Sequence, residues 1–180
     1  RSAFVSGASK GIGVSIAELF AAAGCDLALT ARNEQELEQT AENARKSGVK
    51  VWTKTAEMAD ADEVKAVGNA ALAEFGHIDI LVNNAGVTIP QPILETTLEN
   101  FQTIINVNVL APFLLTQIFA PSMIAKKQGK IVNVTSRAAI RAFPTGSVYS
   151  ASKGALQLLT QSMAVEFGPH NIQTNSVAPT

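Results

Sequence analysis

Disulfide-forming cysteines, excess charge and metal ligands are all scarce in this sequence. Its 180 residues include one cysteine, Cys25, so no internal disulfide can form, and we expect a small buried thiol in a reducing compartment. The 14 basic and 15 acidic side chains leave a net charge of −1, which gives no electrostatic basis for binding nucleic acid or an anionic membrane. His77 and His170 have no companions at metal-ligand spacing, so no metal site is predicted.

Long apolar runs are scarce as well. A membrane-spanning helix needs about 18 apolar residues in succession, and the longest candidate here, VNVLAPFLLTQIFAPSM, is interrupted by Pro112, Pro121 and polar side chains. With 47% hydrophobic and 16% charged residues, the chain is typical of a folded globule. We therefore expect one domain over residues 1–180, located in the cytoplasm and without a membrane partner.

The chain does contain a regular alternation of strand and helix patterns. Short apolar runs such as SAFVSG, DLALTA and IDILVNNAG alternate with amphipathic helical stretches, which predicts six strands and six helices. Uniformly apolar strands are typical of a parallel sheet with helices on both faces. Glycines at 24, 48, 76 and 168 are predicted to end helices in the left-handed conformation. The fold class predicted is α/β, a doubly wound Rossmann-type sheet in three layers.

The segment SGASKGIG, between the first strand and the first helix, is a candidate phosphate-binding loop. Gly7, Gly11 and Gly13 would permit a tight turn and the close approach of a pyrophosphate, and a helix N-terminus offers free N–H groups to it. We expect Ser9 and Ile12 of the same loop to contact the cofactor. The spacing differs from the usual dinucleotide fingerprint, so a turn that binds nothing is the alternative.

The ends of the second and third strands predict which dinucleotide is bound. NAD-selecting domains place an acidic residue after the second strand, but this chain has Arg32 there and Lys10 in the glycine loop. Two cations suit a 2′-phosphate, so we predict NADP(H) over NAD(H), with a solvated arginine as the alternative. After the third strand, Glu57 or Asp60 could accept from the adenine amine and the Met58 N–H could bond a ring nitrogen, although Asp60 is better explained as a helix cap.

Five stretches together resemble the classical short-chain dehydrogenase/reductase family. They are SGASKGIG (6–13), NNAG (83–86), Asn108 in NVNVLAPF, VTS ending at Ser136, and YSASK (149–153), in the family's order. The resemblance implies that Tyr149 is the acid/base, Lys153 its partner and Ser136 the hydroxyl that orients the carbonyl. Asn108 would anchor a proton-relay water.

The resemblance also implies how the cofactor and the subunits are arranged. Asn84, Ala85 and Gly86 would lie near the cofactor ribose, together with Tyr149 and Lys153. The helix that begins near Tyr149 and the one over about 108–126 would form a subunit interface in a homotetramer or homodimer.

Three departures from the family's pattern are visible. Ser6 replaces a threonine but keeps its hydroxyl, and Glu57 replaces the usual aspartate on the adenine side. Pro179, a predicted cofactor contact, is followed by Thr180 where the family usually has glycine. We expect the substrate-binding segment of the family to follow Thr180, so that these 180 residues are a piece of a longer chain.

The chemistry of Tyr149 and Lys153 supports the same roles. A free tyrosine has a pKa near 10 and is a poor base at neutral pH. A lysine four residues along the same helix face puts a cation beside the phenol and favours its ionised form. Ser136 would add a hydrogen bond to the oxygen on which negative charge develops. We therefore predict an oxidoreductase that interconverts a small-molecule carbonyl and a secondary alcohol by hydride transfer.

Other functions remain as alternatives at this point. A non-catalytic nucleotide-binding sensor or scaffold of the same fold would lack Tyr149, Lys153 or Ser136, and all three are present. An extended-branch epimerase disagrees with the glycine spacing, and a hydrolase using Ser136 lacks a suitable histidine. Arg137 and Arg141 flank the presumed pocket and could meet an acidic substrate or simply be solvated. The fold does not select the substrate.

Overall fold

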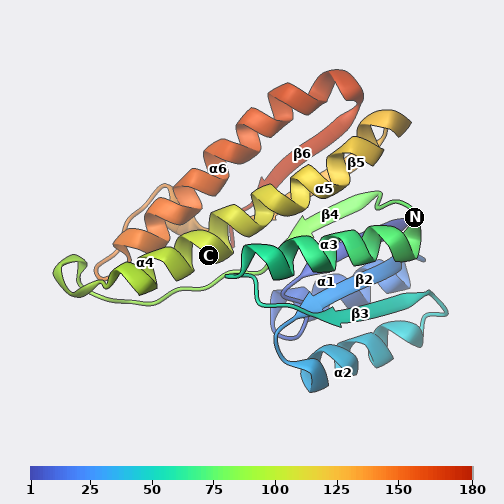
Figure 1. Cartoon of the computed structure of the whole chain (residues 1–180), viewed down its shortest axis with the longest axis horizontal. Coiled ribbons are helices and arrows are strands. Elements are labelled where there is room, and N and C mark those ends of the chain that lie inside the picture. Colours follow the sequence, from blue (N-terminus) through green and yellow to red (C-terminus); the bar gives the residue numbers. More distant parts are fainter. Residues whose placement is uncertain (180) are drawn as a thin grey trace.

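The computed structural model describes residues 1–179, in which six parallel strands form one sheet (Figure 1). The strands are β1 (Ser2–Ser6), β2 (Asp26–Ala31), β3 (Val51–Thr55), β4 (Ile80–Asn83), β5 (Gly129–Val134) and β6 (Ile172–Val177). Their order across the sheet is β3-β2-β1-β4-β5-β6, and every neighbouring pair is parallel. The direction of winding reverses between β1 and β4, and ligands of open α/β sheets bind beyond the carboxyl ends of the strands at such a point.

Helices connect successive strands and cover both faces, which confirms the predicted Rossmann-type layers. They are α1 (Ile12–Ala22), α2 (Glu34–Arg45), α3 (Ala61–Phe75), α4 (Leu98–Ile105), α5 (Ala111–Lys126) and α6 (Ser147–Phe167). Right-handed crossovers place α1 and α2 on one face and α3, α5 and α6 on the other (Figure 1). Each face has its own apolar core, one built on α1 and α2 and the other on α3 and α5.

The apolar run that Pro112 and Pro121 were expected to interrupt lies within one helix. Residues Leu98–Lys126 form one continuous helix, in which α4 and α5 are joined by a π-helical turn over Asn106–Leu110. Pro112 follows directly after the π turn, and Pro121 lies inside α5. Among residues 1–179 this is the one helix with the length and hydropathy of a membrane span, but 56% of its apolar window is buried in the fold, and buried core helices have the same properties.

Helices end at or shortly before all four predicted glycines, but only three of these glycines have the predicted left-handed conformation. Gly24, Gly48 and Gly76 have φ angles between 71° and 78°, in the left-handed region. Gly168 caps α6 with φ −52° and begins a 3₁₀ turn, and the left-handed residue is Asn171 after that turn, at φ 60°. Asparagine tolerates this conformation better than most residues, because its short polar side chain can bond locally.

Candidate active site

The carboxyl ends of β1, β2 and β3 face a cleft of about 610 Å³. The predicted cofactor residues that line this cleft are Gly7, Ser9, Lys10, Ile12, Arg32, Glu57, Met58, Asn84, Ala85 and Gly86. Segments from four different strand ends therefore converge at the reversal point of the sheet. Of the other predicted cofactor residues, Gly11 and Gly13 belong to the adjoining loop, whereas Tyr149, Lys153 and Pro179 line a hollow beside the cleft.

The glycine loop is shaped by contacts that leave no room for side chains. Gly7 has φ 69°, and a Cβ added there would lie 2.9 Å from the Ala85 Cα. A Cβ at Gly13 would lie 2.1 Å from the carbonyl oxygen of Gly7, because α1 starts directly against the loop. Gly11 is the N-cap of α1 and no side chain caps that terminus, so its first N–H groups are free to bind an anion.

Ser6 and Asn84 fix the loop to the end of β4. The Ser6 Oγ accepts hydrogen bonds of 3.1 Å from the backbone N–H groups of Asn84 and Ala85. The Asn84 side-chain amide donates to the carbonyl oxygens of Ser6 and Gly7, both at 3.0 Å. The Ser6 hydroxyl thus makes the contacts between the loop and the end of β4 without the methyl group of a threonine. The Asn84 side chain holds the loop through two of its carbonyl groups.

The two cations of the cleft each lie beside a glutamate. Arg32 is 3.6 Å from Glu57, and Lys10 is 2.9 Å from Glu36. Glu36 was missed by the sequence analysis, because nothing local shows that the first turn of α2 faces the glycine loop. Asp60 accepts from the first N–H groups of α3 and is the helix cap, so of the two acids Glu57 is the one that lines the cleft.

Three of the four predicted catalytic residues line a hollow of about 220 Å³ that adjoins the cleft. Ser136, Tyr149 and Lys153 line it, together with Pro179. The hollow and the cleft share the wall residues Ile12, Asn84, Gly86 and Val87. A dinucleotide that occupied the cleft would therefore extend towards the hydroxyls of Ser136 and Tyr149.

Lys153 carries a buried ammonium group beside the phenol ring. Its side chain is 3% exposed, and burial lowers the pKa of Lys153 to about 8. The Nζ donates to the Val134 carbonyl oxygen at 2.8 Å and lies 5.9 Å from the centre of the Tyr149 ring. With one hydrogen bond made inside the described chain, Lys153 has further N–H groups for a ligand in the hollow.

Asn108 is completely buried in the π turn and joins two parts of the site. Its side chain accepts from the Val87 N–H and donates to the Val87 carbonyl and to the Ser152 Oγ, each at 2.9 Å. Ser152 donates in turn to the Tyr149 carbonyl at 2.7 Å. Asn108 thereby fixes the loop after β4 against α6. Ser152 was missed by the sequence analysis, because only the fold reveals that it faces Asn108.

Ser136 begins the 3₁₀ turn Arg137–Ala139 at the end of β5. Its Oγ accepts from the Ala138 N–H at 3.1 Å, which leaves the hydroxyl proton available to the pocket. A second pocket of about 470 Å³ opens on the other side of Ser136 and Tyr149. The Phe143 ring packs edge-on against Tyr149 in this pocket, with 6.3 Å between the ring centres.

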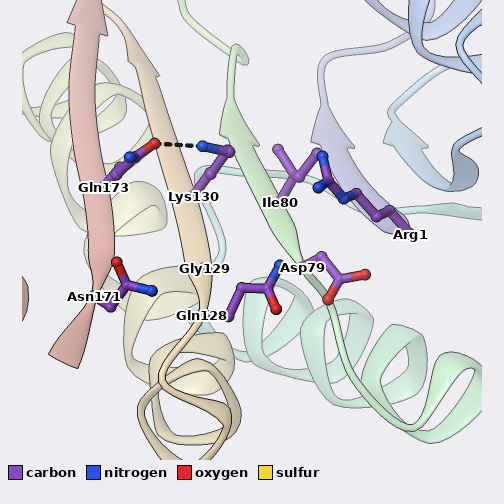
Figure 2. Close-up of a pocket in the computed structure, with 8 residues that line it drawn as sticks. All are labelled: Arg1, Asp79, Ile80, Gln128, Gly129, Lys130, Asn171 and Gln173. Atoms are coloured by element: carbon purple, nitrogen blue, oxygen red, sulfur yellow. Dashed lines mark hydrogen bonds between the residues drawn. The ribbon is translucent and has the colours of Figure 1, made fainter.

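A different pocket lies at the opposite, amino-terminal edge of the sheet (Figure 2). It measures about 180 Å³, and in its wall the Lys130 side chain donates a hydrogen bond to Gln173 on the neighbouring strand. Its lining contains none of the residues predicted to act in catalysis or cofactor binding. Residues 1–179 contain no group of three or more histidine, cysteine, aspartate or glutamate side chains that could hold a metal ion.

Comparisons with known proteins place this geometry in a known family. The family model for short chain dehydrogenases matches residues 1–180. L-xylulose reductase from Mesocricetus auratus is 42% identical over 181 residues, which cover 100% of this chain and 71% of that protein. Gluconate 5-dehydrogenase from Gluconobacter oxydans is 36% identical over 177 residues, 98% of this chain and 69% of that protein.

Solved structures agree with the fold. A metagenomic short-chain oxidoreductase in complex with NADP has a TM-score of 0.96 and 35% identity, over 100% of this chain and 81% of that one. An NAD⁺-bound xylitol dehydrogenase has a TM-score of 0.93 and 29% identity, over 99% of this chain and 69% of that one. Proteins of this architecture thus include both NADP-bound and NAD⁺-bound examples.

Proposed function

The chain belongs to the short-chain dehydrogenase family of oxidoreductases, which bind NAD(P), and we propose that it interconverts a small-molecule carbonyl compound and a secondary alcohol by hydride transfer. The observation that supports this most strongly is the buried Lys153 ammonium 5.9 Å from the Tyr149 ring, in a hollow that adjoins the cofactor cleft. The complete set of Tyr149, Lys153 and Ser136 gives no support to a non-catalytic binding module.

The cleft suits a dinucleotide, and its residues have separable tasks in holding one. The uncapped N-terminus of α1 would bind the pyrophosphate, for which Gly7 and Gly13 leave the surface bare. Lys153 would bond the nicotinamide ribose with the N–H groups that Val134 does not use. A bound nicotinamide cofactor supplies the hydride in reduction and accepts it in oxidation.

Proton transfer is assigned to Tyr149. In reduction its hydroxyl would give a proton to the substrate's carbonyl oxygen as the hydride arrives at the carbon, and in oxidation the phenolate would take it back. Because Lys153 is withdrawn from water, its charge would act on the reacting groups through a medium of low dielectric. The Ser136 hydroxyl, fixed by Ala138, would donate a second hydrogen bond to the same oxygen.

Asn108 would serve the proton path through its backbone. Its side-chain amide is fully occupied by Val87 and Ser152. Its carbonyl oxygen cannot receive the usual helical bond from four residues along, because Pro112 has no N–H. This carbonyl is therefore the group we assign to the relay water that would return a proton to Tyr149.

NADPH is the cofactor we propose as preferred. Arg32 and Lys10 both line the cleft, where a 2′-phosphate would find two cations. Glu57 and the Met58 backbone would lie beside the adenine, and Pro179 beside the nicotinamide.

We also propose that the whole protein is a cytoplasmic homotetramer or homodimer. Apolar side chains remain exposed on the helices expected at the interface, with Phe113 on α5 39% exposed and Leu158 and Val165 on α6 64% and 81% exposed. Sedimentation of the full-length protein would show whether the chain assembles, and a monomer would contradict this part of the proposal.

The catalytic role is tested with Tyr149→Phe in the full-length protein, on a panel of ketones with NADPH and NADH, by following the reduced cofactor's absorbance. We expect kcat/KM to fall about 100- to 10,000-fold, because the ring is kept and only the acid/base is lost. Ser150→Ala is the matched control, since it removes the neighbouring hydroxyl, which makes no hydrogen bond. Near-normal turnover by Tyr149→Phe would contradict the assignment, and cofactor fluorescence would show that the variant still binds NADPH.

A further inference from the structure

Two arginines lie in the pocket on the substrate side of Ser136 and Tyr149. Arg137 follows Ser136 directly and Arg141 follows four residues later, and the Arg141 N–H donates to the Arg137 carbonyl at 3.0 Å. This tight turn brings both residues to the wall of one pocket of about 470 Å³, which Ser136 and Tyr149 also line. The proposed mechanism uses neither guanidinium.

The charge in this pocket is unbalanced. No aspartate or glutamate lines it. Within residues 1–179, neither Arg137 nor Arg141 has a carboxylate within 4.0 Å, whereas Arg32 and Arg45 each pair with a glutamate. The chain as a whole has a net charge of −1, so the positive character is local to the substrate pocket.

The remaining walls are largely apolar. Ala138, Ala142, Phe143 and Pro144 line the pocket together with the two arginines, and the Phe143 ring packs against Tyr149. Both arginines are exposed, so a carboxylate can reach them directly from solvent. Arginine's planar fork matches a carboxylate in a bidentate pair, which fixes orientation as well as charge.

We propose that the substrate is a small keto acid or hydroxy acid, whose carboxylate binds Arg137 and Arg141 while its carbonyl or alcohol carbon faces Tyr149 and Ser136. This inference rests on the proposed oxidoreductase function and names the substrate class for the same site. Since Arg137 and Arg141 belong to a turn that starts at Ser136, the chain couples recognition of the carboxylate to placement of the reacting oxygen.

The test uses the full-length protein with NADPH and a homologous series of straight-chain keto acids, 4-oxopentanoate, 5-oxohexanoate and 6-oxoheptanoate, each against its neutral primary amide. We expect kcat/KM for at least one acid to exceed that of its amide about tenfold or more, as a charged hydrogen-bonded pair provides. In Arg137→Gln/Arg141→Gln this ratio falls towards one, and Arg141→Lys keeps part of it. Arg45→Gln, which removes the same charge at the far end of α2, leaves the ratio unchanged.

Calorimetric binding to the protein loaded with oxidised cofactor separates the inference from the proposed function. If the acid and its amide were reduced, or were bound, equally well, the proposed carboxylate pocket would be wrong. The oxidoreductase assignment would stay intact. Failure to reduce any ketone, acid or neutral, would contradict the proposed function, and the binding arm would still decide whether carboxylates are preferred. A phosphate ester of a hydroxyketone that outcompetes every acid in the series would also overturn the proposal.

Discussion

Positive side chains in the cleft proposed for the cofactor and in the hollow proposed for catalysis have opposite surroundings. Arg32 and Lys10 are 73% and 75% exposed, and each lies beside a glutamate. Lys153 is 3% exposed and has no carboxylate within ion-pair distance in residues 1–179. Exposed ion pairs contribute little to stability, whereas a buried unpaired ammonium carries a desolvation cost that lowers its pKa.

This difference matches the two tasks that we propose for these charges. Cations proposed to bind a phosphate that arrives from water can stay in water, because the phosphate would pair with them. A charge proposed to act on one phenol is more effective where water is excluded, since low dielectric strengthens its effect. The cost at Lys153 is therefore tied to the proposed catalytic role, and the three predictions below test that division, from the largest expected effect to the smallest.

The largest effect is expected in the pH dependence of stability at Lys153. Burial lowers the pKa of Lys153 from its ordinary value of 10.5 to about 8 in the folded protein, so between these pH values the unfolded chain binds more protons. Stability should therefore rise as pH increases from about 8 to 10.5, by about 3 kcal/mol relative to Lys153→Met. Below pH 8 the cost is fully present and the difference is flat.

Urea unfolding of the cofactor-free protein across this pH range measures the difference. Lys130→Met on β5 is the matched control, because it makes the same substitution at an exposed position where burial imposes no cost. An identical pH dependence for the wild type and Lys153→Met would mean that the ammonium is better solvated than the structure shows. It would also remove the contrast with the cleft.

The second prediction concerns the loop that serves both regions. In Gly13→Ala the new Cβ would approach the Gly7 carbonyl oxygen to 2.1 Å, which neither backbone can relieve cheaply. We expect a loss of about 1–3 kcal/mol in unfolding free energy and a clear weakening of NADPH binding. Gly168→Ala is the control, because Gly168 has φ −52° and, among residues 1–179, no atom lies within 4 Å of the added carbon. Equal stability and affinity of the two variants would contradict the proposed tightness of the loop.

The sequence predicted the parts of this molecule that depend on local pattern. The parallel sheet and its layers follow from the alternation of apolar runs and amphipathic helices. The position of SGASKGIG between β1 and α1 is equally local. Its glycines at 7 and 13 proved necessary for contacts that the spacing alone could not show.

What the sequence did not predict depends on distant contacts. The bonds of Asn108 connect it to Val87 and Ser152, 21 and 44 residues away, and no periodicity reports them. The continuous helix through Pro112 was missed because proline usually interrupts a helix, and the sequence does not show that a π turn joins the two helical segments. The Lys10–Glu36 ion pair joins the glycine loop to the first turn of α2, and this contact depends on how α1 and α2 pack together. Two statements stay predictions: that residues 1–180 form a single domain, and the roles assigned to the site residues.

The smallest effect is expected at the exposed pairs of the cleft. If Glu36 and Glu57 occupy the cations that would bind a 2′-phosphate, then Glu36→Gln and Glu57→Gln should each tighten NADPH binding about two- to fivefold. NADH affinity should not change, because that cofactor lacks the phosphate, and the gain should shrink with added salt. Glu42→Gln, on the exposed side of α2, is the matched control. Equal tightening of both cofactors would show that these glutamates act on the cleft's overall charge, and weaker NADPH binding would show that they orient Arg32 and Lys10 for the phosphate.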